Sequence, residues 1–187
     1  MGAEVCAPGK RESRTRLILE RRQPSEWTSM QNSTFEIMAA EPDSEEAAIL
    51  IQALDADLRR RYPGVAVRGL HPEDVQDRRL TFLIAHADGQ AIGCGAVRQL
   101  EPGVGEVKRM FVQPTWRRRG VARQLLAALE SRARSLGYLA LRLETAEGQP
   151  EAIGLYRSAG YVDIPPFGEY IGNPVSVCLE KRLTIGS

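Results

Sequence analysis

The stretch that decides the fold is Gly105-Glu106-Val107-Lys108-Arg109-Met110-Phe111-Val112-Gln113-Pro114-Thr115-Trp116-Arg117-Arg118-Arg119-Gly120-Val121-Ala122. It reads as a strand, a turn and then the pattern Arg117-x-x-Gly120-x-Ala122, which opens a helix with apolar periodicity over 121–136. The first N–H groups of a helix have no intrahelical acceptor and lie at the positive end of its dipole, so they bind phosphate groups. Gly120 has no Cβ to hold a ligand away from the main chain, and three arginines precede it. The stretch therefore predicts a pyrophosphate-binding loop.

Two other phosphate-binding patterns do not fit this chain. A Walker loop needs Gly-x-x-x-x-Gly-Lys followed by Ser or Thr, and neither Gly-Lys-Ser nor Gly-Lys-Thr occurs. A dinucleotide fingerprint needs Gly-x-Gly-x-x-Gly between a strand and a helix, but Gly93-Cys94-Gly95 and Gly103-Val104-Gly105 do not open helices. One alternative stays open, an ordinary Arg-rich helix start in which Gly120 serves the backbone geometry alone.

Composition excludes several classes of protein. The length of 187 residues suits one main domain, and a net charge of +1 gives no reason to expect nucleic-acid binding. The three cysteines and two histidines form no Cys-x-x-Cys or other metal-ligand spacing, so we expect no disulfide framework, no metal and a reducing compartment. No apolar run reaches the ~18–20 residues of a membrane helix. A soluble, cytoplasmic protein is expected.

The first 33 residues differ from the rest of the chain. They lack periodicity and are rich in Arg, Glu and Ser, which predicts a disordered N-terminal extension, with Met30 as an alternative translation start. A partner-binding arm is the other interpretation. Folding signals begin at Thr34, so residues 34–187 are expected to form the folded domain.

The order of elements in that domain predicts a mixed α/β fold. The sequence Pro42-Asp43-Ser44-Glu45-Glu46 is typical of a helix start, and Asp88-Gly89 between two β-rich runs predicts a hairpin. Antiparallel hairpins come first and a βαβ crossover later. Strands are expected over 34–40, 80–87, 90–100, 104–112, 138–144, 161–164 and 175–183, and helices over 42–61, 121–136 and 150–159, with a further short helix starting at Pro72-Glu73-Asp74.

The chain resembles the GNAT family of acyl-CoA-dependent N-acetyltransferases over residues 34–183. The resemblance rests on the phosphate loop and on 149–161, which is similar to the family pattern Ala-x-x-Leu-Tyr-x-x-x-Gly-Phe/Tyr in Ala152-Ile153-Gly154-Leu155-Tyr156-Arg157-Ser158-Ala159-Gly160-Tyr161. It implies a central mixed, mostly antiparallel sheet flanked by helices, with a V-shaped split between strands 4 and 5. It also implies acetyl-CoA as donor and direct attack of an amine on the thioester, without a metal.

The resemblance assigns residues to the donor. The main chain of Met110, Phe111 and Val112 would hydrogen-bond pantetheine, and a family-type bulge there would direct an N–H at the thioester oxygen. The pyrophosphate would contact the loop and helix start. Arg123 is assigned to the 3′-phosphate, with a solvated side chain as the alternative. The loop residues so assigned are Arg117, Arg118, Arg119, Gly120, Val121 and Ala122.

Glu106 and Tyr156 are the candidate catalytic residues. Glu106 begins the fourth strand, where some GNAT members carry a catalytic acid, and it is the candidate base, acting directly or through water. Its alternative role is an ion pair with Lys108. Tyr156 resembles the family tyrosine that faces the CoA sulfur and is the candidate acid; its alternative role is a buried aromatic. Alternation in a regular strand places Glu106, Lys108, Met110 and Val112 on one face and Val107, Arg109 and Phe111 on the other.

The acceptor is expected to be a small amine or an amino acid. An ammonium group can pair with Glu169, and a carboxylate with Arg98, Lys108 or Arg109. The pocket-lining candidates are Arg98, Lys108, Phe167, Glu169 and Tyr170. Two alternatives stay open, a protein N-terminal or lysine acetyltransferase and a non-catalytic acyl-CoA-binding regulatory module. A homodimer is compatible with the sequence, which does not fix the oligomeric state.

Overall fold

A computed structural model describes residues 35–64, 69–70, 74–75, 77 and 79–184. The helices and strands of these residues belong to the unit Thr34–Ser187. The expected N-terminal extension 1–33 and most of the expected helix start at Pro72-Glu73-Asp74 lie outside the described residues.

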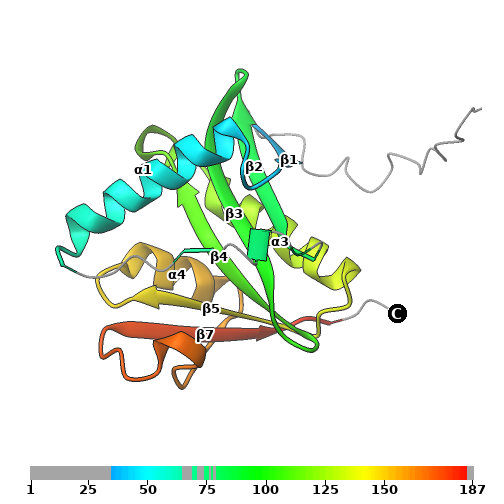
Figure 1. Ribbon diagram of the computed structural model, residues 1–187, viewed down its shortest axis with the longest axis vertical. Coiled ribbons are helices and arrows are strands. Elements are labelled where there is room, and N and C mark those ends of the chain that lie inside the picture. Colours follow the sequence, from blue (N-terminus) through cyan, green and yellow to red (C-terminus); the bar gives the residue numbers. More distant parts are fainter. Residues whose placement is uncertain (1–34, 65–68, 71–73, 76, 78, 185–187) are drawn as a thin grey trace, which may run out of the picture. The chain divides into compact units, whose positions relative to one another are not determined.

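One seven-stranded sheet organises the unit, with the strand order β1-β2-β3-β4-β5-β7-β6 (Figure 1). Neighbouring strands pair antiparallel, except that β4 and β5 are parallel. The predicted mixed, mostly antiparallel sheet is thus confirmed. The strands are β1 Glu36–Ala39, β2 Thr81–Ala87, β3 Gln90–Glu101, β4 Val104–Val112, β5 Ala140–Ala146, β6 Val162–Ile164 and β7 Ser176–Arg182.

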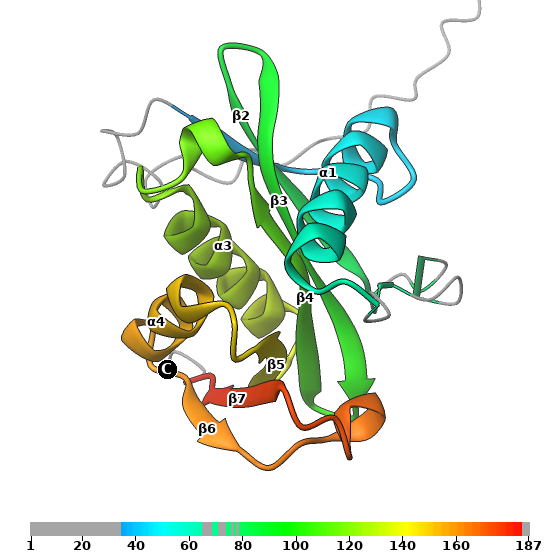
Figure 2. The same cartoon turned by 90° about the vertical axis from the view of Figure 1, so that its left-hand side faces the viewer.

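Helices cover both faces of the sheet (Figure 2). Helix α1, Glu45–Arg61, packs on one face, where Leu50 meets Ile84 and Phe111 in a buried cluster. Helices α3, Val121–Ser135, and α4, Pro150–Ser158, pack on the other face in the larger cluster, which contains Leu125 and Tyr156. Each face therefore has its own apolar core, and the sheet lies between the two.

Local signals in the sequence place the first elements. The Ser44 Oγ accepts the N–H of Ala47 at 3.3 Å, and acids follow in the first turn, so α1 begins where the capping pattern predicts. Asp88 and Gly89 have φ of 50° and 74°, the left-handed pair that a two-residue hairpin turn requires, and they join β2 to β3.

The two parallel strands pair over only part of their length. Among the described residues the β4–β5 ladder runs from Val104↔Ala140 to Val107↔Leu143, although β4 continues to Val112 and β5 to Ala146. Beyond Val107 the two strands diverge, which is the predicted V-shaped split. The split leaves main-chain groups of β4 without a strand partner on the side facing β5.

Candidate active site

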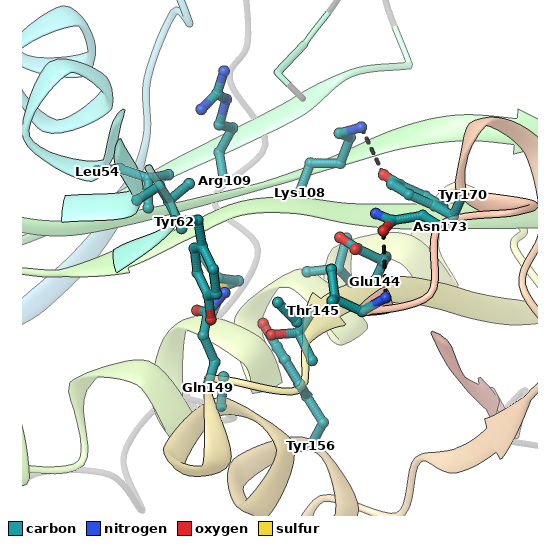
Figure 3. A pocket seen from close by; sticks show the side chains of 16 residues that line it. Leu54, Tyr62, Lys108, Arg109, Glu144, Thr145, Gln149, Tyr156, Tyr170 and Asn173 are labelled. Atoms are coloured by element: carbon teal, nitrogen blue, oxygen red, sulfur yellow. Dashed lines mark hydrogen bonds between the residues drawn. The ribbon is translucent and has the colours of Figure 1, made fainter. Parts of the chain in front are cut away.

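A cavity of about 170 Å³ lies at the split between β4 and β5 (Figure 3). Its walls come from α1, from the diverging ends of the two strands, from α4 and from the segment before β7. Some of these residues lie far apart in the sequence, so the cavity exists only in the folded domain. The lining residues are Leu54, Leu58, Tyr62, Val107, Lys108, Arg109, Met110, Glu144, Thr145, Ala146, Gln149, Ala152, Tyr156, Tyr170, Asn173 and Val175.

A β-bulge interrupts β4 at the wall of this cavity. Cys94 pairs with Phe111 and Ala96 pairs with Lys108, so β4 has one more residue than β3 between these two pairs. Arg109 has a φ of 58°. The extra residue inverts the alternation of side chains beyond Lys108.

The bulge corrects the predicted faces of β4. Glu106 and Lys108 do share a face, as predicted, but Arg109 bonds Asp55 of α1 at 2.6 Å and Phe111 lies in the α1 cluster, on that same face. Met110 and Val112 instead pack in the cluster of Val107 and α3. The prediction was wrong for the residues after Lys108, because it assumed an uninterrupted strand.

The segment Gly93-Cys94-Gly95 of β3 accommodates the bulge. The Cys94 thiol donates to the Arg109 carbonyl at 3.3 Å, and burial raises the pKa of Cys94 to about 12, which keeps the thiol protonated. A Cβ on Gly95 would lie 2.6 Å from the Met110 Sδ, and one on Gly93 would lie 2.7 Å from the Phe111 carbonyl oxygen. The Gly-x-Gly pattern, which does not fit a dinucleotide fingerprint, thus leaves room for the bulged part of β4.

The loop before α3 presents the start of that helix. Gly120 is the N-cap residue, with a φ of 85°, and its carbonyl accepts the N–H of Gln124 at 3.1 Å. The N–H groups of Val121, Ala122 and Arg123 precede Gln124, so helix geometry gives them no intrahelical acceptor. A Cβ on Gly120 would meet nothing within 4 Å, so its backbone conformation is what favours glycine there.

The arginines of the loop have different environments. Arg117 donates through Nε to the Val112 carbonyl at 3.0 Å and through Nη2 to Asp57 at 3.2 Å, so it ties the loop to β4 and α1. The exposed Arg119 lies 4.7 Å from the centroid of the Trp116 ring, and Arg118, also exposed, has a φ of 66°. Arg123 donates to the Ser158 Oγ of α4 at 2.9 Å. Their contacts with phosphate stay predictions.

Tyr156 lines the cavity from α4. Its ring packs edge-on against Tyr161 with 5.9 Å between centroids, inside the larger cluster. Its hydroxyl points toward the cavity (Figure 3). Burial, and then the charge of Glu144, raise the pKa of Tyr156, so the phenol holds its proton at neutral pH.

Glu106 lies behind the cavity wall. Its side chain is 0% exposed, and it is not among the lining residues. Arg98 donates to the Glu106 Oε2 at 2.7 Å, and the Tyr170 hydroxyl donates to Oε1 at 2.7 Å. The Lys108 Nζ lies 3.7 Å from Oε1. Both carboxylate oxygens are therefore engaged, and the predicted ion pair with Lys108 exists within a larger network.

The five acceptor candidates divide into two layers. Lys108 and Tyr170 line the cavity, whereas Arg98, Phe167 and Glu169 are not among its lining residues. Arg98 also bonds Asp74 at 3.1 Å, and Glu169 accepts from the Lys108 Nζ at 3.1 Å. The Phe167 ring packs edge-on against Tyr170, with 5.2 Å between centroids. Glu169 and Phe167 thus contact the two lining residues directly, whereas Arg98 bonds Glu106 and Asp74.

Sequence reasoning missed one acidic residue of the cavity. Glu144 lies on β5 where β5 leaves β4, and it accepts a hydrogen bond from the Ser176 Oγ at 2.6 Å. The predicted strand 138–144 ended at this residue, whereas β5 continues to Ala146. Its place at the end of a strand beside the expected split was the signal that could have identified it.

Comparison with known proteins decides the family. The model of the acetyltransferase (GNAT) family matches residues 47–161. The chain belongs to the GNAT family. A protein of Azospirillum brasilense named IAA acetyltransferase is 41% identical over 148 residues, which cover 78% of this chain and 97% of the relative.

Solved structures of GNAT proteins share the fold. A Klebsiella pneumoniae protein assigned as an acyl-CoA N-acyltransferase has 36% identity and a TM-score of 0.69, with coverage of 80% of this chain and 98% of its own. A PaiA N-acetyltransferase of Thermoplasma acidophilum, crystallised with coenzyme A, has 18% identity and a TM-score of 0.60, with coverage of 79% and 98%. GNAT acetyltransferases use acetyl-CoA as the acyl donor.

Two kinds of feature are absent from the described part of the chain. Residues 35–64, 69–70, 74–75, 77 and 79–184 contain no group of three or more His, Cys, Asp and Glu side chains arranged to hold a metal ion. None of the helices in the same ranges combines the length and the apolar character needed to cross a membrane.

Proposed function

We propose that this enzyme transfers the acetyl group of acetyl-CoA to the amine of a small molecule or amino acid, by direct attack on the thioester. The observation that carries the proposal is the cavity at the β4–β5 split. It is bordered by unpaired main chain of β4 on one side and by Lys108, Glu144 and Tyr170 on the other. Donor and acceptor can meet there.

The donor's main requirement is main-chain hydrogen bonding. The pyrophosphate would bind the N–H groups that open α3 at Val121 and Ala122, with positive charge from the loop arginines. The pantetheine arm would pair with Met110–Val112, where β4 pairs with β3 but lacks a strand partner on the side facing β5. Bound acetyl-CoA supplies an activated acyl carbon, and the bulge at Arg109 supports an N–H directed at the thioester oxygen.

The chemistry needs a neutral amine and a proton for the leaving thiolate. The protonated Tyr156 is proposed as the general acid, since its hydroxyl points into the cavity and its pKa is raised. Glu106 is proposed as the base, and because it lies behind the wall, it reaches the amine through an intermediary. Glu144, which lines the cavity, is proposed to attract the acceptor ammonium.

The size of the cavity favours a small acceptor over a peptide. Its volume of about 170 Å³ is below the roughly 300–1,000 Å³ of pockets that bind drug-sized ligands. The name of the Azospirillum relative agrees with a small acceptor. The cytoplasmic location and the homodimer stay predictions.

A thiol-release assay tests the proposed function. Acetyl-CoA is offered with panels of small amines, amino acids and peptides of matched concentration, and calorimetry measures binding of acetyl-CoA and CoA. We expect heat with both forms of the cofactor and thiol release with members of the small-molecule panels. Binding without release on any panel would support the non-catalytic alternative, and release with peptides alone would contradict a small acceptor.

A further inference from the structure

Glu106 is separated from the cavity by one hydroxyl group. The Tyr170 hydroxyl donates to the Glu106 Oε1 at 2.7 Å, and the Lys108 Nζ donates to the same Tyr170 oxygen at 2.9 Å. Tyr170 and Lys108 line the cavity, whereas Glu106 does not. A continuous hydrogen-bonded path therefore joins the cavity to a fully buried carboxylate.

We propose that Tyr170 is a proton relay, which passes the acceptor amine's proton to Glu106. The inference rests on the proposed function and names the intermediary through which Glu106 acts. A proton leaves the ammonium nitrogen for the Tyr170 oxygen while the Tyr170 O–H proton moves to the Glu106 Oε1. The freed lone pair attacks the thioester carbon, the C–S bond breaks, and the thiolate takes a proton from Tyr156. Solvent then takes the proton from Glu106 and the second proton that the attacking nitrogen loses as the amide forms, and it returns one proton to Tyr156.

The hydrogen-bond directions suit such a relay. The Lys108 Nζ has only donors, so it fixes the Tyr170 oxygen as acceptor on that side and directs the hydroxyl proton toward Glu106. Burial, and then the charge of Glu106, raise the pKa of Tyr170. A free phenolate is therefore costly, and the hydroxyl gives up its proton as it receives another.

Two cations hold the carboxylate at the end of this path. The Lys108 Nζ lies 3.7 Å from the Glu106 Oε1 and 3.1 Å from the Glu169 Oε1. Arg98 also holds the Glu106 Oε2 at 2.7 Å, which leaves the oxygen facing Tyr170 to receive the proton.

Glu144 supplies the competing explanation. It is the carboxylate that lines the cavity directly, on β5. If Glu144 took the proton itself, then Tyr170 and Glu106 would only shape the wall. The experiment must therefore distinguish proton transfer through Tyr170 to Glu106 from direct proton transfer to Glu144.

A double-mutant cycle on the full chain makes this separation. Tyr170→Phe and Glu106→Gln, alone and combined, are compared with the wild type in kcat/KM against pH, using the best small amine from the panel. In each single variant, kcat/KM is expected to fall on the order of 100-fold. The acid limb of its pH profile should also disappear. The combined variant should lie within about twofold of the slower single variant, because the two residues act as one path.

Three controls keep the outcome interpretable. Tyr138→Phe removes another buried tyrosine hydroxyl, outside the cavity, and should retain wild-type kcat/KM. Calorimetry with CoA checks that each variant still binds the donor. Glu144→Gln should raise KM for the amine while the acid limb remains.

Several results would overturn the relay. These are an unchanged pH profile in Tyr170→Phe, losses that multiply in the combined variant, or loss of the acid limb in Glu144→Gln alone. A wild type without turnover on any amine would instead overturn the proposed function. The relay and the function thus fail by different observations.

Discussion

The proposed donor and acceptor surfaces are built from different parts of the chain. The proposed donor surface consists of main-chain groups, namely the edge of β4 beyond Val107, at the cavity, and the start of α3 after Gly120, outside the cavity lining. The proposed acceptor surface consists of side chains from β4, β5 and the segment before β7, joined by hydrogen bonds that involve charged groups. Main-chain sites depend on backbone geometry and tolerate varied side chains, whereas side-chain networks depend on each member.

The largest expected effect separates chemistry from donor binding. Tyr156→Phe should lower kcat by about 100-fold or more, because the thiolate loses its proton donor, while the Kd for CoA stays the same. Since burial raises the pKa of Tyr156, the phenol is protonated below pH ~10, and the wild-type profile should show no loss of Tyr156's proton in that range. Stopped assays and calorimetry measure the two quantities.

Tyr138→Phe is the matched control for Tyr156→Phe. It deletes a hydroxyl that is equally buried but lies away from the cavity. A Tyr156→Phe enzyme as fast as this control would remove Tyr156 from the mechanism.

Gly120→Val should weaken binding of the donor without changing the acceptor surface. A β-branched residue at a φ of 85° costs about 1–3 kcal/mol, and it moves the N–H groups that open α3. The Kd for CoA is expected to rise between about tenfold and 100-fold. Gly154→Ala, in helix α4 with open space around the site, is the control and should bind CoA as the wild type does. Equal affinities would show that the α3 start does not hold the donor.

Gly95→Ala should disturb the bulge in β4, which borders both the donor and the acceptor surface. The added Cβ would lie 2.6 Å from the Sδ of the half-buried Met110 and 2.9 Å from the Cδ1 of the buried Leu129. Overpacking of this kind costs about 1–3 kcal/mol of stability, which urea unfolding measures. We expect kcat to fall as well, since the bulge shifts. Gly89→Asn, at a turn with open space, should leave kcat unchanged.

The smallest effect is expected from Arg117→Lys. Arg117 bonds Val112 and Asp57 through two different nitrogens, a geometry that lysine cannot reproduce. The side chain is 35% exposed, so the loss should be below about 1 kcal/mol, or a few-fold in the Kd for CoA. A loss as large as that of Gly120→Val would mean that the Arg117 side chain, rather than the main chain, holds the pyrophosphate.

Local patterns in the sequence predicted much of the fold around the site. The cap at Ser44, the Asp88-Gly89 turn and the glycine before α3 are encoded within a few residues, and each specifies a backbone conformation. Strand β4 was predicted with the bounds that the structure has. The bulge was not visible, because it depends on the neighbouring strand and on Gly95 there.

The side-chain contacts of the proposed acceptor surface were not predicted, for a physical reason. Several of its hydrogen bonds join residues 61–64 positions apart, such as Lys108 with Glu169 and Glu106 with Tyr170. Such contacts depend on how the segment before β7 packs, which no local pattern records. The sequence suggested Arg98 and Glu169 as substrate contacts, which stays a prediction, and it did not show that they also bond Glu106 and Lys108. It overlooked Glu144, which lines the cavity.

The short parallel ladder between β4 and β5 has a consequence for the dynamics of the enzyme. Within the described part of the chain, only the four pairs from Val104↔Ala140 to Val107↔Leu143 join these two strands. A donor lying along β4 would act as a missing strand and slow amide hydrogen exchange there. At a concentration of 100 times Kd it would add about 2.7 kcal/mol of stability. Amide exchange of Met110 and Val112 would then report directly on cofactor occupancy during turnover.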